Sequence, residues 1–530
     1  MTHDVVIIGG GPVGLGLAID LGQRGHSVAV VERYRDLHPV PKGQNLTQRT
    51  LEIIDHWGCE RELRAARIVP RGVANGGLVT YGTLLGEHAY NWLPRESVGT
   101  YYGQSVDRMP QYCTERVLRE RVADLPSVEM FYGWRFDALA QDAEGVVVDI
   151  VEYKGEVRRS LRGRYAVGSD GSHSATREAA GIGQEVKDHD RKMVLLVFQS
   201  PELHRLLGER YEEKSFYYAL SPELEGYWKF LGRVDGDRTW FYHAPVAVEA
   251  TAENTDFAAM LHEAAGQEFA LDINYVGFWD LRFVLAESYR AGRVLIAGDA
   301  CHSHPPYGGY GINTGFEDAR NLGWKLGAVL EGWGGDGLLD SYDAERRPVF
   351  ASLRDDFIER FIEEDRAFLR TYDPEDDAEA FAREWAARNV GSTEVFTYEP
   401  HYEGSPLVGG PGRPAAKGDH QFTARAGHHL APRALSDGRT TYQALDGSAF
   451  TLFDFNGLMG EDFVGVAEAA GVPLTVIRDR YEGERCDYGT RAILVRPDGY
   501  VAWAGEAGEA AEILMRAVGR GIPDSFVRLS

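Results

Sequence analysis

Three short segments, far apart in the chain, combine glycine with residues that could contact a nucleotide. The first is Gly9-Gly10-Gly11-Pro12-Val13-Gly14, the second is Gly168-Ser169-Asp170-Gly171, and the third begins at Gly298-Asp299 and continues into a glycine-rich run that ends at Gly311. Glycine lets backbone amides approach a phosphate closely, and a carboxylate accepts hydrogen bonds from ribose hydroxyls. Three such segments in one chain predict a dinucleotide that is held from several sides.

The first segment lies inside a predicted βαβ unit. Residues 5–8 form a β-branched run typical of a buried parallel strand, residues 13–21 carry apolar side chains at helical spacing, and residues 28–31 predict a second strand. Glu32 ends that strand, about 20 residues after the glycine loop, where a carboxylate is placed to bind a ribose. This unit predicts nucleotide binding but does not by itself distinguish FAD from NAD.

Each glycine of the loop has a separate expected role. Gly9 allows a tight turn, Gly11 lets the backbone approach a pyrophosphate, and Gly14 permits close packing of the helix on the strand. The Asp170-Gly171 and Gly298-Asp299 segments each follow a predicted strand, and the third opens a helix near residues 312–313. All three segments are therefore expected to follow strands.

Composition limits the class of protein and its partners. The chain has 530 residues, 44% of them hydrophobic, and a net charge of −25, which predicts two or three globular domains and excludes a nucleic-acid partner or an anionic membrane surface. Its four cysteines form no CxxC pair and no apolar run approaches membrane-spanning length, and we expect no signal peptide. The sequence predicts a cytoplasmic protein.

The three segments together make the chain similar to single-component FAD-dependent aromatic hydroxylases with the p-hydroxybenzoate hydroxylase fold. The stretch from Gly298 to Lys325 most resembles the phenol and 2,4-dichlorophenol hydroxylase branch, and polyketide hydroxylases are similar in the same stretch. The resemblance extends over essentially the whole chain. It implies an α/β fold (α+β overall) with a Rossmann-type FAD-binding domain.

The resemblance also implies how the chain divides. The FAD-binding domain is expected to be discontinuous, with residues 1–75, 100–185 and 281–390, and a β-rich substrate domain of residues 76–99 and 186–280 is interleaved with it. Aromatic runs in the substrate domain predict antiparallel strands with one exposed face. A linker over residues 391–415 leads to a thioredoxin-like C-terminal domain, residues 416–530, which lacks CxxC and is therefore expected to be structural or to contact a second subunit.

The resemblance implies FAD that is tightly but not covalently bound, and NADPH or NADH that binds transiently. No second glycine fingerprint is present for a resident nicotinamide cofactor. Lys42 stands where the family usually has arginine. The expected cofactor-binding residues are Gly9, Gly11, Pro12, Gly14, Glu32, Arg33, Lys42, Arg49, Gln111, Asp170, Arg177, Asp299, Pro306, Gly308, Gly309, Gly311, Ile312 and Asn313.

The implied reaction is hydroxylation of an electron-rich ring, such as a phenol, hydroxypyridine or polyketide, through a flavin C4a-hydroperoxide formed from O2. Four residues are catalytic or substrate-contacting candidates, namely Tyr217, Tyr242, His243 and Pro306. His304 is a further candidate by its position. No metal site is predicted, because His302-x-His304 lacks the additional carboxylate or cysteine ligands that a zinc site requires.

Two other functions use the same FAD motifs. One is a Baeyer–Villiger-type oxygenase or a reductase on this fold, and a more remote one is a non-catalytic FAD-binding scaffold. The expected partners are a small aromatic substrate and further copies of the chain in a homodimer or higher homo-oligomer, with neither nucleic acid nor membrane. The sequence does not identify the aromatic substrate.

Overall fold

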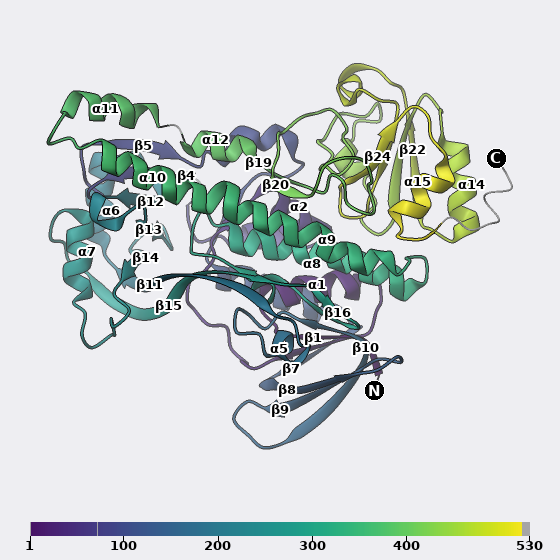
Figure 1. The fold of residues 1–530 in the computed structure, drawn as a ribbon, viewed down its shortest axis with the longest axis horizontal. Helices are drawn as coiled ribbons and strands as arrows, with labels where there is room; N and C mark the ends of the chain where they lie inside the picture. The colour runs from purple at the N-terminus through teal and green to yellow at the C-terminus, as the bar shows by residue number, and fades with distance from the viewer. Residues whose placement is uncertain (1, 71–72, 389, 522–530) are drawn as a thin grey trace.

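The computed structural model describes residues 2–70, 73–388 and 390–521, so residues 1, 71–72, 389 and 522–530 of the predicted domains lie outside the described part. Three sheets organise the molecule (Figure 1). Two have eight strands each, and a four-stranded sheet belongs to the C-terminal region, drawn in yellow-green. Helices and strands alternate in the α/β arrangement predicted from the sequence, and the fold class is confirmed.

The first sheet has a parallel centre of Rossmann type, in the order β17-β10-β1-β2-β7. Its strands are β16 (Arg290–Ala291), β17 (Val294–Ile296), β10 (Arg158–Gly168), β1 (Thr2–Ile8), β2 (Val28–Glu32), β7 (Val128–Tyr132), β8 (Trp134–Gln141) and β9 (Val146–Glu152). Residues 5–8 of β1 are buried on both faces of the sheet, which explains their continuous β-branched run. All three glycine segments follow parallel strands of this sheet, namely β1, β10 and β17.

Helices pack around this sheet, and α1 begins directly after β1. They are α1 (Pro12–Gln23), α2 (Gln48–His56), α3 (Glu60–Ala65), α4 (Gln111–Ala123), α5 (Ala175–Ala179), α8 (Tyr310–Glu331) and α9 (Gly337–Ser352). Figure 1 shows α8 and α9 crossing the centre of the molecule side by side. Helix α9 continues through a π-helical turn, Leu353–Glu359, into α10 (Arg360–Thr371), followed by α11 (Ala378–Ala387) and α12 (Val390–Thr397).

The second sheet is the β-rich one. Its strands, in spatial order, are β18 (His302–Ser303), β15 (Asp272–Ala286), β11 (Gln184–Gln199), β14 (Thr239–Val246), β13 (Lys229–Arg233), β12 (Lys214–Leu220), β4 (Ala74–Tyr81) and β5 (Ala89–Trp92). Pairing is antiparallel except between β12 and β4, which run parallel. Helices α6 (Pro201–Arg210) and α7 (Phe257–Ala265) pack against it. The predicted domain limits themselves stay a prediction.

The expectation of an exposed face is wrong for the inner strands of this sheet. Residues 215–220 of β12 and residues 240–243 of β14 are all buried. Alternate side chains of β12 enter two different cores, because Tyr217 packs with α6 and α7 whereas Phe216 and Tyr218 pack toward the first sheet. The aromatic alternation thus separates two buried faces rather than a buried face from solvent.

The C-terminal region has the thioredoxin-like arrangement. Strand β21 (Phe450–Phe455) pairs in parallel with β22 (Leu474–Asp479) and antiparallel with β23 (Ala492–Val495), which pairs with β24 (Val501–Gly505). Helices α14 (Gly460–Ala470) and α15 (Ala510–Ala517) pack on one face. The four cysteines of the chain are free thiols. The remaining short elements are β3 (Asn45–Leu46), β6 (Asp107–Arg108), β19 (Tyr398–His401), β20 (Ala415–Lys417) and α13 (Thr441–Ala444).

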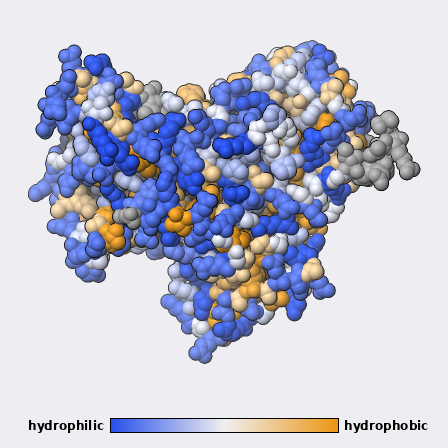
Figure 2. Space-filling view, viewed as in Figure 1, coloured by the Kyte–Doolittle hydropathy of each residue, from blue (hydrophilic) through white to orange (hydrophobic). Residues whose placement is uncertain are grey.

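The surface agrees with the acidic composition. The face drawn in Figure 2 is predominantly hydrophilic, with hydrophobic residues scattered in small groups. Within the described ranges, no helix combines the length and apolar character needed to cross a membrane.

Candidate active site

A cavity of about 1050 Å³ lies between the two large sheets. That volume is at the upper end of the range for ligand pockets, so it is large enough for a cofactor and a substrate together. The predicted residues that line it are Gly9, Gly11, Pro12, Glu32, Arg33, Lys42, Gln111, Asp170, Asp299, Pro306, Gly309, Gly311 and Ile312. The structure therefore brings the three glycine segments of the sequence to one site.

In the glycine loop between β1 and α1, some glycines are required for close packing and another leaves space for a ligand. Gly9 has φ +108°, and a Cβ atom there would lie 2.2 Å from the carbonyl oxygen of Ser169. A Cβ on Gly14 would lie 2.0 Å from the carbonyl oxygen of Gly9. Gly11, by contrast, has no atom within 4 Å of its Cβ position and borders the cavity. Gly11 thus leaves space beside its backbone for a ligand, whereas Gly9 and Gly14 are required for packing within the described structure.

Glu32 closes this loop from the end of β2. Its Oε2 accepts a hydrogen bond from the Gly10 amide at 2.8 Å, and its Oε1 accepts one from the Tyr34 amide at 2.7 Å. The Arg33 guanidinium lies over the Tyr34 ring, 4.9 Å from its centroid. These residues form the cavity end that is expected to hold the adenosine half of a dinucleotide.

Asp170 organises the second segment. Its Oδ2 accepts hydrogen bonds from both the amide and the hydroxyl of Thr176, each at 3.0 Å, and so fixes the first turn of α5. Arg177 does not line the cavity. Its buried guanidinium donates to the carbonyl oxygens of Ala300 at 3.2 Å and Ser172 at 3.4 Å. Arg177 therefore ties the second segment to the third instead of reaching a ligand.

Asp299 projects into the cavity from a short turn after β17. The surrounding protein withdraws its carboxyl from bulk water and raises its pKa, although His302 and Lys42 oppose this shift. The turn is fixed from behind, because Asp318 accepts hydrogen bonds from the Gly298 amide at 3.1 Å and Arg346 at 2.7 Å. The sequence thus places the Asp299 carboxyl at the cavity surface, directly after β17.

The glycine-rich run after β18 ends at the start of α8. Gly308 and Gly309 adopt φ +59° and +69°, but only Gly309 lines the cavity. Asn313 also lies outside it. Its side-chain amide donates to the carbonyl oxygens of Asn45 at 2.8 Å and Gly309 at 2.6 Å. Asn313 therefore holds the first turn of α8 against β3.

Of two further residues predicted to contact the cofactor, Gln111 lines the cavity and Arg49 does not. Gln111 lines the cavity, accepts a hydrogen bond from the Gly43 amide at 3.2 Å and donates to Glu115 at 2.7 Å. Arg49 lies elsewhere: its guanidinium bonds to Glu317 at 2.9 Å and Glu52 at 3.1 Å, beneath the C-terminal region. The placement of Arg49 gives no support to a phosphate contact, because these carboxylates already neutralise it.

The opposite end of the cavity is aromatic and contains His243. The imidazole lies between the rings of Phe241 and Trp279, with centroids 5.2 and 5.0 Å away, and stacks over Phe230 at 6.0 Å. Burial lowers the pKa of His243 to about 3, so the ring is neutral near pH 7. This wall is flat, apolar and suited to a planar ring.

Tyr217 and Tyr242, predicted as catalytic candidates, do not reach the cavity. Both are buried in the core on the far face of the sheet, with α6 and α7. Tyr242 is adjacent to His243 in the sequence, and successive side chains of a strand point to opposite faces. Of the three strand candidates, only His243 is therefore placed to contact a substrate. His304 borders the cavity, where burial lowers its pKa to about 4.

Sequence reasoning missed Arg108, which is buried beside the aromatic wall. Its Nη2 donates to the side-chain oxygen of Gln44 at 3.2 Å and the carbonyl oxygen of Arg233 at 3.0 Å. Its Nε and Nη1 have no partner among the described residues. Burial, with Arg67 and Arg233 nearby, lowers the pKa of Arg108 to about 9. Its position just before Pro110-Gln111 was the only available signal.

The residues present fit FAD. Helices α1 and α8 both begin at the cavity, with N-cap residues Gly11 and Gly309 that supply no side-chain cap. The first amides of a helix have no internal acceptors and carry partial positive charge, so they suit a pyrophosphate and an electron-rich flavin ring. The open Cβ position of Gly11 leaves room for the ligand.

Comparison with known proteins agrees with this fit. A family model described as an FAD binding domain matches residues 2–356, and one described as the C-terminal part of aromatic-ring hydroxylases matches residues 423–522. The chain belongs to the FAD-dependent aromatic-ring hydroxylases. It is an oxidoreductase that uses FAD, a reduced nicotinamide and O2 to hydroxylate aromatic rings.

Two relatives of this hydroxylase match along nearly their whole length. It is 30% identical to a putative polyketide hydroxylase of Streptomyces halstedii, over 96% of this chain and 94% of that protein. It is 31% identical to 4-methyl-5-nitrocatechol 5-monooxygenase of a Burkholderia species, over 94% and 93%. Among solved structures, the substrate-free rebeccamycin biosynthetic enzyme RebC shares 27% identity with a TM-score of 0.80, and aklavinone-11 hydroxylase in complex with FAD and aklavinone shares 25% with a TM-score of 0.80. Each alignment covers 98% of this chain and 99% of the other.

Proposed function

We propose that the hydroxylase acts on a phenolic ring within a multi-ring aromatic compound and binds that ring as an anion. The observation that carries the proposal is the buried guanidinium of Arg108, which borders the cavity beside the aromatic wall and has no carboxylate partner among the described residues. A buried charge without a counter-ion is costly, so an anionic group of the substrate would stabilise it.

A second arginine strengthens the positive potential. The Arg233 guanidinium is also buried, and its hydrogen bonds go to the carbonyl oxygen of Lys214 and to the His204 ring, neither of which carries negative charge. Arg108 donates to the carbonyl oxygen of Arg233. The Arg233 side chain itself packs with α6 and does not line the cavity, so Arg108 is the cation placed to favour phenolate over phenol, and the phenolate ring is the more nucleophilic form.

The chain positions the reaction, and FAD, once bound and reduced, supplies the oxygen chemistry. The aromatic wall of Phe230, Phe241 and Trp279 excludes water from one face of the substrate ring and fixes its plane. His243 stays uncharged and offers a neutral ring nitrogen beside the substrate. We assign the carbonyl of Pro306, which borders the same cavity, to orienting the substrate hydroxyl.

The size of the cavity and the relatives together favour a multi-ring substrate. A volume of about 1050 Å³ leaves space beyond a cofactor, and two relatives are named as a putative polyketide hydroxylase, from S. halstedii, and as anhydrotetracycline monooxygenase, from Streptomyces rimosus and 32% identical. Assembly into a homodimer or higher homo-oligomer, a cytoplasmic location and the stated domain limits stay proposals from the sequence.

The experiment tests whether binding depends both on a phenolic hydroxyl in the ligand and on the positive charge of Arg108. Tetracyclic and single-ring phenols, each paired with its methyl ether, are titrated into FAD-loaded wild type, Arg108→Met and Arg108→Lys, and bound ligand and products are measured. We expect the phenol, but not its methyl ether, to bind at least about tenfold more weakly to Arg108→Met, with partial recovery in Arg108→Lys. Equal losses for phenol and ether would contradict anion binding. An ester or lactone product instead of a new ring hydroxyl would favour the Baeyer–Villiger alternative.

A further inference from the structure

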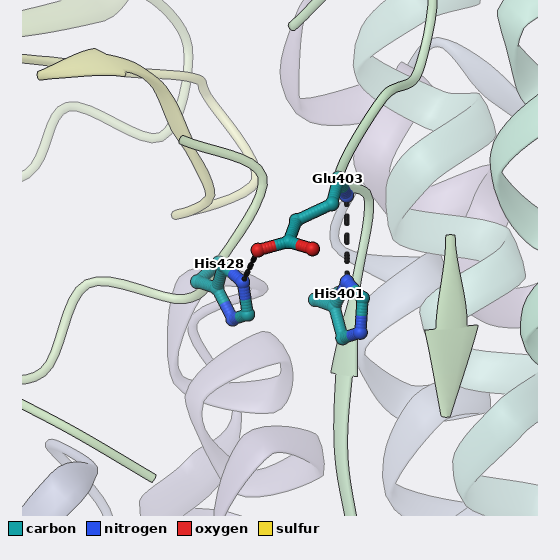
Figure 3. A group of neighbouring side chains, drawn as sticks. All are labelled: His401, Glu403 and His428. Carbon is teal, nitrogen blue, oxygen red and sulfur yellow. Dashed lines mark hydrogen bonds and ion pairs between the residues drawn. The ribbon is translucent and has the colours of Figure 1, made fainter. Parts of the chain in front are cut away.

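Three potential metal ligands meet at the junction between β19 and the C-terminal domain, away from the flavin cavity. They are His401, Glu403 and His428, and their candidate ligand atoms all lie within 4.8 Å of one another. Figure 3 shows Glu403 directed between the two imidazoles, with His401 on the strand segment that continues into Glu403 and His428 on a separate loop opposite. The two imidazole rings are stacked, with centroids 4.6 Å apart.

The hydrogen bonds of the two histidines fix which ring nitrogen faces the centre. The Nδ1 of His428 lies 2.9 and 3.0 Å from the two carboxylate oxygens of Glu399, and the Nε2 of His401 lies 3.2 Å from the carbonyl oxygen of Lys417. Both partners only accept hydrogen bonds, so these nitrogens carry the protons. His401 Nδ1 accepts a hydrogen bond from the Glu403 amide, so its lone pair lies on the Glu403 side, whereas His428 Nε2 donates to the Glu403 carboxylate and would lose that proton on binding an ion.

This pattern is the outer shell that metal-binding histidines usually have. A ligating imidazole commonly donates its other N–H to a carboxylate or a backbone carbonyl, which orients the ring and increases its basicity. Here Glu399 orients His428 and the carbonyl of Lys417 orients His401. The contacts that an ion would replace are the His428–Glu403 hydrogen bond at 2.9 Å and the long bond from the Glu403 amide to His401 at 3.4 Å.

Charge and access are also suitable for a cation. Glu399 and Glu403 contribute two negative charges, and a neighbouring cation, Arg425, lies 3.9 Å from Glu399 and offsets one of them. Both histidines are buried, whereas the side chain of Glu403 is 41% exposed. An ion can thus enter from solvent past Glu403 and exchange its water for the two imidazoles.

We propose that His401 Nδ1, His428 Nε2 and the Glu403 carboxylate bind a divalent ion of the zinc class, with water completing the coordination. Imidazole and carboxylate together suit Zn²⁺, whereas Ca²⁺ and Mg²⁺ prefer oxygen ligands alone. The sequence alone predicts no metal site because His428 is remote from the His401-x-Glu403 pair along the chain.

The role of the site is structural. The amide of Tyr402, between two of the ligands, donates to the carbonyl oxygen of Gly427 at 2.7 Å, and the amide of Val501 on β24 donates to the carbonyl oxygen of His428 at 2.8 Å. A bound ion would add a further link between the chain after β19 and the C-terminal sheet. It would therefore stabilise the docking of that domain without entering the hydroxylation chemistry.

The test uses the full-length, FAD-loaded protein after removal of metals by a chelator. Zinc chloride, calcium chloride and magnesium chloride are titrated separately by calorimetry, with the melting temperature recorded in parallel. We expect one equivalent of Zn²⁺ to bind and to raise the melting temperature, and no comparable effect of Ca²⁺ or Mg²⁺. No stoichiometric Zn²⁺ binding, or equal binding of Ca²⁺, would overturn the proposal and leave an ion-pair network in its place.

Variants locate the site. Glu403→Gln and His401→Gln are expected to weaken Zn²⁺ binding at least about tenfold and to abolish its effect on the melting temperature. His88→Gln is the matched control, because His88 lines neither this site nor the flavin cavity. If His401→Gln fails to fold, Glu403→Gln decides, since its side chain is partly exposed. Unchanged Zn²⁺ affinity in Glu403→Gln would exclude this ligand set.

Discussion

Arg496, next to the end of β23, donates hydrogen bonds to both carboxylate oxygens of Glu345 on α9, at 2.6 and 3.0 Å. Both side chains are fully buried, and Lys325 bonds to the same carboxylate at 2.6 Å. Neighbouring Arg496 and Lys325 hold the pKa of Glu345 well below its usual range, although burial opposes this. A buried ion pair thus joins the C-terminal domain to the helices that cover the FAD-binding sheet.

Removing one partner of this pair is expected to destabilise the protein strongly. Arg496→Met leaves the Glu345 carboxylate buried with only part of its compensation, and such changes cost about 3–5 kcal/mol. The free energy of unfolding, measured by urea denaturation, reports this. Arg478→Met is the control, because Arg478 pairs with Glu461 on the exposed surface and such pairs contribute about 1 kcal/mol or less. Similar losses in the two variants would contradict the docking role of Arg496.

Substitutions in the glycine loop are expected to separate cofactor binding from folding. Gly11 has an extended backbone and an open Cβ position, so Gly11→Val should fold but block the ligand and weaken FAD binding at least about tenfold, or about 1.4 kcal/mol. Gly14→Val places a side chain against the carbonyl oxygen of Gly9 and should lower the melting temperature itself. Flavin absorbance per protein and circular dichroism measure the two effects. Tight FAD binding by Gly11→Val would show that the cofactor lies elsewhere.

The adjacent residues His243 and Tyr242 are expected to behave oppositely, because they face different sides of β14. Tyr242→Phe removes a buried hydroxyl with no partner among the described residues and should leave turnover unchanged. His243→Phe alters the cavity wall and should lower coupling of nicotinamide oxidation to hydroxylation. Steady-state rates with product quantification distinguish the two. A larger effect of Tyr242→Phe than of His243→Phe would reverse the assignment of faces.

Glu394 is expected to make stability depend on pH. Burial raises its pKa to about 7 from the ordinary 4.5, while its hydrogen bond with Tyr310 and the nearby Arg95 oppose the shift. Between these values the unfolded chain is ionised and the folded protein is not, so stability falls as pH rises from about 4.5 through 7. The total loss of stability, complete once the pH is above 7, is about 3 kcal/mol, because each unit of pKa difference contributes roughly 1.4 kcal/mol.

Glu394→Gln should remove this contribution, so that its stability relative to wild type increases between pH 5 and pH 8. Urea unfolding at the two pH values measures it. Asp365, whose pKa burial also raises to about 7, remains in both proteins, and since Glu394 contributes to that shift, its removal lowers the pKa of Asp365 and changes the pH dependence in the same direction. Parallel pH dependence of wild type and Glu394→Gln would exclude a buried, protonated Glu394.

The parts of the site encoded by local sequence were predictable. Gly9, Gly11 and Gly14 act through the turn that they themselves form, and Asp299 follows directly from β17. Residues whose role depends on partners distant in the sequence could not be predicted in this way. Arg49 looks like a phosphate ligand until Glu317 and Glu52 are seen to neutralise it.

Strand candidates needed the tertiary structure for a different reason. Two-residue alternation separates Tyr242 from His243, but it does not say which face meets the flavin, and both faces of this sheet are buried. Apart from its position just before Pro110-Gln111, the sequence does not indicate a role for Arg108, because a buried cation without a counter-ion is recognised only in the tertiary structure.

Transfer of labelled oxygen tests the central claim most directly. The FAD-loaded enzyme is given reduced nicotinamide, a phenolic substrate selected by the binding titration and ¹⁸O₂, and the product is analysed by mass spectrometry. The account predicts one ¹⁸O atom in a new ring hydroxyl for each nicotinamide oxidised, with this yield lost in Gly11→Val. Hydrogen peroxide as the sole product with every phenol that binds, or a ring hydroxyl whose oxygen comes from water, would contradict it.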